Sequence, residues 1–424
     1  MNNLIPVLFF LATQNLTSQW HANYQEDSVP DYDLPEILVD NKGNKINTIK
    51  EWESKRRAEI IEQFAGEVYG RVPDKKIRIE TRLTEKGIAL EGKAFRKQVK
   101  MVFYNGDDSL DMDILLYTPT KTEEYPVFLG MNFYGNHTIH EDEKIKITDS
   151  WVRNNENFSI NGNMAKVASR GVRSHRWPLE QIIDRGYGLA TLYYGDIDPD
   201  FDDRFKNGIH PLFYKKKQKK PENDEWGSIN AWAWGLSRAM DYLETEPDVD
   251  NNQVVVMGHS RLGKAALWAG ARDERFALVI SNESGCGGAA LSRRQYGETV
   301  ERINDAFPHW FCKNFHKYGK NVNKLPVDQH MLIALMPPRP VYVASAQGDH
   351  WADPKGEFLS ALYAGKVYEL YGKKGLPVNE MPPVNTPLNK TSVGYHIRTG
   401  NHDITLYDWM QYLDFADLHF GKEK

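Results

Sequence analysis

The stretch Val254–Lys264, which reads VVVMGHSRLGK, places one serine where nucleophilic chemistry is feasible. Its β-branched residues predict a short buried strand, and apolar residues at helical spacing follow from Leu262 onward. Ser260 falls on the tight turn between strand and helix, beside the N–H groups that open the helix. Such groups can stabilise an oxyanion, so the turn indicates acyl transfer. Alone, the stretch fits equally well with Ser260 as an ordinary helix N-cap, and Leu262 replaces the second glycine of Gly-x-Ser-x-Gly.

A serine nucleophile needs a basic partner, and His402 is the best candidate for that role. In the chain order serine, acid, histidine, the base lies late in the sequence. His402 follows the last expected strand, in the tight turn Thr399–Asp403. His396 competes with it, but a histidine inside a strand is expected to pack against the sheet.

Two carboxylates compete to orient the histidine. Asp349 follows the penultimate expected strand, and Glu283 follows the strand directly after the serine turn. Both fall at carboxyl ends of neighbouring strands, where active-site groups of open α/β sheets gather, so the choice stays open. Asp353 precedes a proline at a helix start and is expected to be a cap.

The elements that must position these residues form an α/β pattern. Strands and helices alternate from Tyr125 onward, which predicts a doubly wound, mostly parallel sheet with helices on both faces. The expected strands of this region cover residues 125–133, 188–194, 254–258, 276–281, 340–346 and 395–398. Before them, a helix is expected from Thr48 and two antiparallel strands over 78–90 and 94–104. Residues 138–178 are polar and irregular, and we expect them to cover one side of the site.

Composition excludes several classes of function. The net charge is −5, and the lysine-rich run 215–220 is followed by acidic residues, so nucleic-acid binding is not expected. No stretch is long and apolar enough to span a membrane. The 11 Trp, 21 Tyr and 18 Phe residues mostly serve the core, and exposed ones are also suited to stacking on sugars. We expect neither a metal nor a cofactor, and we expect a monomer.

The N-terminus predicts export. Leu4–Ala12 is an apolar run followed by polar residues, typical of a secretory signal peptide, although no Lys or Arg precedes it. We assign residues 1–18 to this peptide and 19–424 to one catalytic domain, with an N-terminal extension over 19–120 and the nucleophile and base within 121–424. Cys286 and Cys312 are enough for one disulfide, which the sequence alone does not establish.

Five segments together resemble the glucuronoyl methylesterases, carbohydrate esterases that cleave esters of glucuronic acid on xylan. These segments are residues 132–137, Gly258–Lys264, Asn282–Gly288, Gly348–Pro354 and Gly400–His402. The Ser-Arg-x-Gly-Lys turn is specific to this family. Fungal members carry a disulfide that joins the positions held here by His259 and Asp403, so the chain resembles the bacterial branch. The resemblance implies an α/β-hydrolase fold.

The resemblance also implies roles for the polar residues. Ser260 would be the nucleophile and His402 the base. Glu283 matches the family's acid, and some bacterial members also hold an acid at the position of Asp349. Arg261 would donate to the oxyanion through its backbone and guanidinium.

Three further residues match positions that contact the uronate in the family. Lys264 would reach sugar hydroxyls, and Glu298 and Trp351 would add contacts. The expected substrate is a glucuronoxylan or lignin–carbohydrate ester, with 4-O-methyl-glucuronic acid esterified to a methyl or lignin-type alcohol. An esterase for acetylxylan or another acyl sugar is the first alternative, and an inactive carbohydrate-binding protein is the second.

Overall fold

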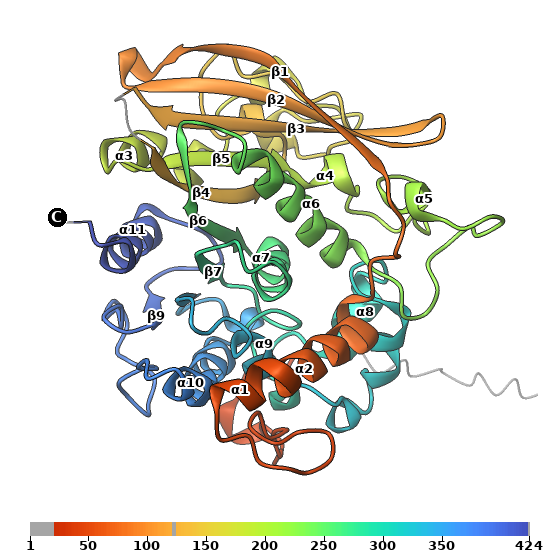
Figure 1. Ribbon diagram of the computed structural model, residues 1–424, viewed down its shortest axis with the longest axis vertical. Helices are drawn as coiled ribbons and strands as arrows, with labels where there is room; N and C mark the ends of the chain where they lie inside the picture. Colours follow the sequence, from red (N-terminus) through yellow and green to blue (C-terminus); the bar gives the residue numbers. More distant parts are fainter. Residues whose placement is uncertain (1–20, 121–123, 423–424) are drawn as a thin grey trace, which may run out of the picture.

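The computed structural model describes residues 21–120 and 124–422, and these build one mixed sheet of nine strands in the order β1-β2-β3-β5-β4-β6-β7-β8-β9 (Figure 1). The first four in this order are antiparallel neighbours, and all pairs from β5 to β9 are parallel. The strands are β1 Arg78–Ala89, β2 Ala94–Asn105, β3 Asp108–Pro119, β4 Tyr125–Asn132, β5 Gly188–Tyr193, β6 Val249–His259, β7 Leu278–Asn282, β8 Val341–Ala346 and β9 Val393–Arg398.

Helices cover both faces of the sheet, as the alternating pattern predicted. The α-helices are α1 Ile49–Glu51, α2 Arg57–Phe64, α3 Leu179–Asp184, α4 Tyr194–Ile197, α5 His210–Phe213, α6 Ser228–Leu243, α7 Arg261–Arg272, α8 Val300–Ala306, α9 Gln329–Ile333, α10 Pro354–Leu370 and α11 Leu406–Phe420. In Figure 1, α6 and α7 lie on one side of the sheet, and α3 and α11 lie on the other.

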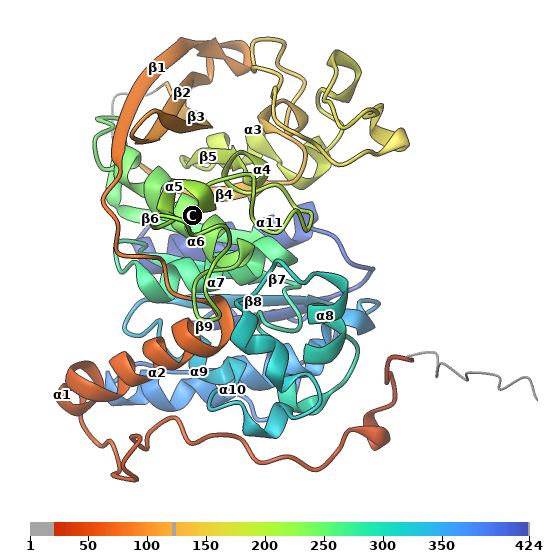
Figure 2. The same ribbon diagram turned by 90° about the vertical axis from the view of Figure 1, so that its right-hand side faces the viewer.

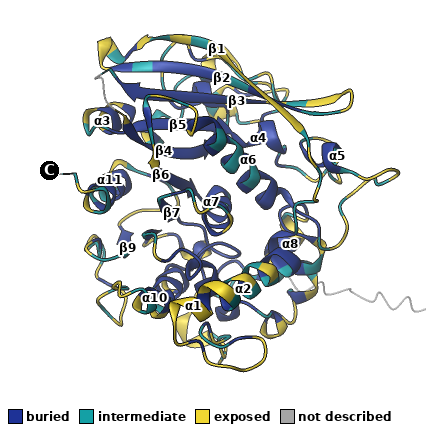
Figure 3. Cartoon of the chain, viewed as in Figure 1, coloured by how far each residue is buried: buried dark blue, intermediate teal, exposed yellow. Residues whose placement is uncertain are grey.

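The side chains of strand β6 pack into two hydrophobic cores, one on each face of the sheet. Val254 and Val256 pack into the core shared with α6 and α7, whereas Val255 and Met257 pack into the core shared with α3 and α11. Successive side chains of a strand point to opposite faces, so a central strand must be apolar at every position. Figure 3 shows the resulting dark, buried interior of the parallel strands.

The N-terminal elements also follow their sequence patterns. Thr48 caps the first helix in a capping box with Glu51, and the helix continues with π-helical turns to Tyr69. Strands β1 and β2 pair antiparallel as expected. One local expectation was wrong: residue 194, expected to end a strand, begins the short helix α4.

The parallel register brings the polar strand ends to one edge of the sheet. His259 pairs with Asn282 at the ends of β6 and β7, and Ala346 pairs with Arg398 at the ends of β8 and β9. Residues 138–178 contain only 3-10 turns and loops, and they form the yellow segment at the upper right of Figure 2. This segment contributes one wall of the pocket described below, as the sequence predicted.

The structure bears on three expectations, which concern the signal peptide, membrane spans and a disulfide. The predicted signal peptide lies outside the described residues. Within those residues, none of the helices is long and apolar enough to cross a membrane. Cys286 and Cys312 are buried free thiols and form no disulfide.

Candidate active site

Ser260 lies on a strained turn that holds its hydroxyl away from the helix it precedes. Its backbone has φ 58° and ψ −131°, which a residue other than glycine rarely adopts. Ser260 occupies the N-cap position of α7, but its side chain makes no capping hydrogen bond. The turn is too tight for a side chain at Gly258, where a Cβ would lie 2.0 Å from the carbonyl oxygen of Leu262. The N-cap alternative therefore does not describe what this hydroxyl does.

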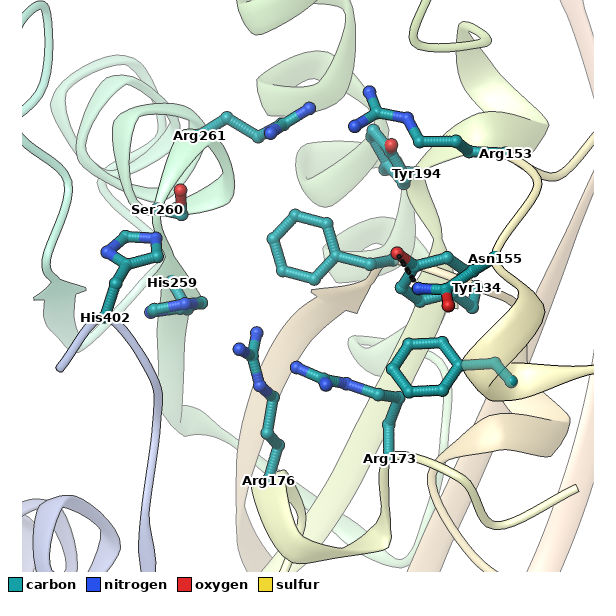
Figure 4. A pocket seen from close by; sticks show the side chains of 12 residues that line it. Tyr134, Arg153, Asn155, Arg173, Arg176, Tyr194, His259, Ser260, Arg261 and His402 are labelled. Atoms are coloured by element: carbon teal, nitrogen blue, oxygen red, sulfur yellow. Dashed lines mark hydrogen bonds between the residues drawn. The ribbon is translucent and has the colours of Figure 1, made fainter. Parts of the chain in front are cut away.

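The imidazole of His402 faces Ser260, and both side chains line the same pocket (Figure 4). Its Nδ1 atom lies 2.6 Å from Asp349 Oδ2, in a hydrogen bond, and 3.2 Å from Glu283 Oε2. The side chain of His402 is 41 % exposed, whereas Glu283 is fully buried and Asp349 is 4 % exposed. One histidine is therefore held by two buried acids while its outer edge stays open to a ligand.

Electrostatics favour the charged form of this histidine. Burial lowers the pKa of His402, but the bonds to Asp349 and Glu283 outweigh burial and raise this pKa to about 9. Burial also raises the pKa of Glu283 to about 7, although His402 and Arg398 oppose that shift. A proton that arrives on the imidazole is thus stabilised by the two acids beneath it.

Glu283 is fixed by more than the histidine. The guanidinium of Arg398 donates to Oε1 at 2.6 Å, and the backbone N–H of Asp403 donates to Oε2 at 2.9 Å. Glu283 itself has φ 47°, a conformation that bends the chain sharply as it leaves β7. Asp349 has the shorter bond to the imidazole, and Glu283 has the more rigid support. The structure brings both candidate acids to His402.

The guanidinium of Arg261 is held by a buried carboxylate, Asp200, on the segment after β5. Asp200 also accepts from Arg153 at 2.8 Å, from Trp310 at 2.8 Å and from His309 at 3.0 Å. Burial would raise the pKa of Asp200, but its pairs with Arg261 and His309 hold that pKa well below the usual range. The Arg261 guanidinium also lies over the Trp310 ring, with Cζ 4.6 Å from the ring centroid. Asp200 therefore sets the position of Arg261.

The pocket in front of Ser260 has a volume of about 260 Å³. Strand ends and α7 supply one wall, and the irregular segment 138–178 supplies the other (Figure 4). Its lining residues are Phe133, Tyr134, Arg153, Asn155, Phe158, Arg173, Arg176, Tyr194, His259, Ser260, Arg261 and His402. These are aromatic, basic or small polar side chains, so the cavity suits a ligand with oxygen acceptors and flat or apolar faces.

The three predicted uronate contacts lie near one another but are not part of this lining. Lys264 is 4 % exposed, its amine bonds the carbonyl of Ser284, and Nζ lies 4.0 Å from Glu298 Oε2. Burial lowers the pKa of Lys264, and the charge of Glu298 opposes this shift. The Glu298 backbone N–H donates to the Trp351 carbonyl at 3.0 Å. Contact between these residues and a sugar stays a prediction.

A metal ion would have to compete with existing bonds at this site. His259, Glu283 and His402 each offer a ligand atom within 4.8 Å of the others. However, Nδ1 of His402 already bonds Asp349, and Nδ1 of His259 contacts Asn282 at 2.5 Å. Glu283 is occupied by Arg398 and Asp403. Each of the three residues thus already bonds a protein partner through at least one of its possible ligand atoms.

The competing residues lie where the sequence placed them. His396 is fully buried in the sheet, where it bonds Asp408 at 2.9 Å and Tyr342 at 3.0 Å. Asp353 caps α10 by accepting from the backbone N–H of Gly356 at 3.0 Å. Both expectations are confirmed.

Sequence reasoning missed several polar residues around the site: Arg153, Arg173, Arg176, Asp200 and Arg398. Two of them carried a signal that was available. Asp200 follows the expected strand that became β5, and Arg398 is a charged residue inside an expected buried strand. The three arginines of segment 138–178 carried none, because irregular chain has no periodicity that tells which side chains face inward.

Comparisons with known proteins agree with this geometry. The family model described as "Glucuronyl esterase, fungi" matches residues 205–372. A relative from an unknown prokaryotic organism, "Carbohydrate esterase MZ0003", is 54 % identical over 94 % of this chain and 92 % of its own. A "4-O-methyl-glucuronoyl methylesterase 1" of Wolfiporia cocos is 36 % identical over 44 % of this chain and 47 % of its own.

A solved structure extends the likeness to the whole fold. The "Glucuronoyl Esterase from Solibacter usitatus" is 48 % identical, covers 93 % of this chain and 100 % of its own, and superposes with a TM-score of 0.88. The chain belongs to the glucuronoyl esterase family of carboxylic ester hydrolases and has its α/β-hydrolase fold.

Proposed function

We propose that the protein is a serine esterase that hydrolyses the ester between C6 of 4-O-methyl-glucuronic acid and an alcohol. One observation carries this proposal: a strained serine that caps nothing faces a histidine held by two buried acids. A Wolfiporia cocos relative is named a 4-O-methyl-glucuronoyl methylesterase, which supports the choice of substrate.

In the proposed reaction, the ester carbonyl lies against Ser260 and the first turn of α7. His402 takes the hydroxyl proton as the oxygen attacks, and Asp349 and Glu283 stabilise the imidazolium. The Arg261 backbone N–H, which has no partner inside the helix at that position, and its guanidinium donate to the oxyanion. His402 then protonates the leaving alcohol, and water attacks the acyl-enzyme with the same base.

We place the uronic acid ring toward Lys264, Glu298 and Trp351, and the alcohol in the pocket of Figure 4. Hydroxyl-rich sugar suits a paired lysine and glutamate, and an exposed tryptophan offers a stacking face. The natural setting we propose is glucuronoxylan in lignocellulose, cut by an exported, monomeric enzyme that needs no metal or cofactor.

The test compares alcohol release from benzyl glucuronate with acetate release from acetylated xylan. Wild-type protein should hydrolyse the glucuronate, and Ser260→Ala should lose at least about 10⁴-fold in rate. Ser54→Ala, an exposed helix serine far along the chain, is the matched control and should keep full activity.

Hydrolysis of only the acetylated xylan would reject the uronate assignment. Activity that survives Ser260→Ala would reject the serine mechanism. Binding to xylan without hydrolysis of either ester would support a binding protein instead.

A further inference from the structure

The pocket in front of Ser260 has a charge that the proposed ester does not need. Four arginines line it: Arg153, Arg173, Arg176 and Arg261. None of the described residues that line the pocket is an Asp or a Glu. The carboxyl group of a glucuronate ester is neutral, because its oxygen is bonded to the alcohol. Two donors are commonly enough for the oxyanion of acyl transfer, and Arg261 and the helix start already supply these.

Carboxylates behind the wall do not balance these charges. Asp200 is shared by Arg153 and Arg261. Asp403 is shared by Arg173, Arg176 and His175, with Arg176 Nε at 2.5 Å, His175 Nε2 at 3.5 Å and Arg173 Nη2 at 3.9 Å. In direct contacts, four guanidiniums thus share two carboxylates, an excess of about two positive charges among these groups; Glu283 and Glu298 act on Arg176 and Arg261 through their charge alone.

Arg173 and Arg176 carry half of this excess, because they share one carboxylate, Asp403. Each side chain is about 15 % exposed, and Figure 4 shows their guanidinium ends turned into the hollow across from Ser260. Burial and the neighbouring charge of Arg173 lower the pKa of Arg176 to about 10, so the two groups repel each other. The Nε atom of Arg173 is buried and has no hydrogen-bond partner. An anion between these groups would relieve their repulsion.

Aromatic rings frame the same arginines. The guanidinium of Arg173 lies 5.1 Å from the centroid of Phe158, and that of Arg176 lies 6.0 Å from the centroid of Phe133. Tyr134 lies edge-on to Phe158, with centroids 5.0 Å apart. A ligand held here therefore meets flat apolar faces beside the cationic groups.

We propose that Arg173 and Arg176 form a subsite for an anionic group on the alcohol half of the ester, favouring aryl-alkyl alcohols that carry a carboxylate. This rests on the proposed function, which places the uronic acid toward Lys264 and leaves the arginine-lined pocket to the alcohol. The subsite selects substrates and takes no part in bond breaking.

The experiment uses a matched pair of substrates, 4-carboxybenzyl glucuronate and the neutral, isosteric 4-carbamoylbenzyl glucuronate. Wild-type protein should show a kcat/KM at least about tenfold higher for the carboxylate at low salt, because charge-assisted hydrogen bonds are strong in a partly dry pocket. This ratio should fall as salt is added. In the double variant Arg173→Gln/Arg176→Gln the ratio should fall to about one.

Arg82→Gln, a change of an exposed arginine on β1, is the matched control and should keep the wild-type ratio. The ratio compares two substrates of one protein sample, so partial misfolding of a variant does not alter it. A wild-type ratio of one or less would overturn the subsite. Hydrolysis of neither ester would instead reject the proposed function itself.

Inhibition by the two products separates the two possible sources of the anion. 4-(Hydroxymethyl)benzoate should inhibit the wild type more strongly than benzyl alcohol does, and the double variant should lose that difference. If the double variant loses inhibition by glucuronate instead, the arginines bind the acid product and the proposal is wrong.

Discussion

The two walls of the pocket in front of Ser260 differ in the sign of the charge that they concentrate. The wall made by strand ends holds one histidine against two buried acids, with Nδ1 2.6 Å from Asp349 and 3.2 Å from Glu283. The wall made by residues 138–178 holds arginines with too few acids. The acids of the first wall stabilise the imidazolium that forms during the reaction. The arginines of the second wall place positive charge next to the ligand.

The walls also differ in what supports them. Glu283, Asp349 and His402 follow β7, β8 and β9, whose register is set by a sheet buried on both faces. The arginine wall has only turns and loops, held by contacts such as the Arg173 backbone N–H to the Thr138 carbonyl at 2.8 Å. The catalytic residues, which need a fixed geometry, are thus positioned by the sheet. The residues that we propose select the substrate lie in loops, which tolerate changes of sequence.

Removing the base should break the catalytic wall most completely. His402→Gln keeps the size of the side chain but cannot take the serine proton, so kcat should fall by about 10⁴-fold or more. The measurement is kcat on benzyl glucuronate, with thermal unfolding to show that the fold persists. A loss of less than about tenfold would mean that another group serves as the base.

Substitutions of the two acids should have the next largest effects on kcat. Asp349→Asn removes the shorter bond and should lower kcat by about 100-fold, and Glu283→Gln should lower it by about tenfold, because each variant leaves one carboxylate on the imidazole. Neither change alone should abolish activity. The double variant should approach His402→Gln. Loss with one acid and no change with the other would show that only one acid works.

Asp200 tests the link between the walls, since it binds both Arg261 and Arg153. Asp200→Asn leaves the largely buried guanidinium of Arg261 without its carboxylate, so the free energy of unfolding should fall by about 3 kcal/mol. We also expect kcat to fall by about tenfold as Arg261 loses its position. Denaturant unfolding and kcat on benzyl glucuronate measure the two effects. A stable variant with normal kcat would show that Asp200 does not hold Arg261 in place.

The pH profile gives the smallest and most specific effect. The base must be neutral to accept a proton, so kcat/KM should rise with pH through the pKa of His402, which the acids raise to about 9. Asp349→Asn removes one charge that favours the imidazolium, so the rising limb should move to lower pH. A limb that moves upward, or does not move, would contradict the proposed role of Asp349.

The sequence predicted the structure best where burial imposes a periodic pattern of apolar residues. The apolar run of β6 and the spacing of α7 placed Ser260 between strand and helix, and the structure has that turn. The positions of His402 and of both acids followed from strand ends in the same way. A sequence could not show which acid lies closer, because the difference between 2.6 Å and 3.2 Å arises from loop packing.

The arginine wall could not be predicted for a related reason. Arg153, Arg173 and Arg176 are charged residues in polar chain, where a solvated side chain is the ordinary outcome. Only the fold of residues 138–178 over the sheet edge turns them toward Ser260. The predicted uronate contacts at Lys264 and Glu298 show the converse, since their motif is clear but their side chains are buried.

The central claim is that Ser260, activated by His402, forms a covalent acyl-enzyme, and a serine-directed fluorophosphonate tests it most directly. Intact-protein mass spectrometry should show one adduct, and peptide mapping should place it on Ser260. Ser260→Ala should take up none, and His402→Gln should react far more slowly. A fully active protein that remains unlabelled, or that carries the adduct on another serine, would contradict the account.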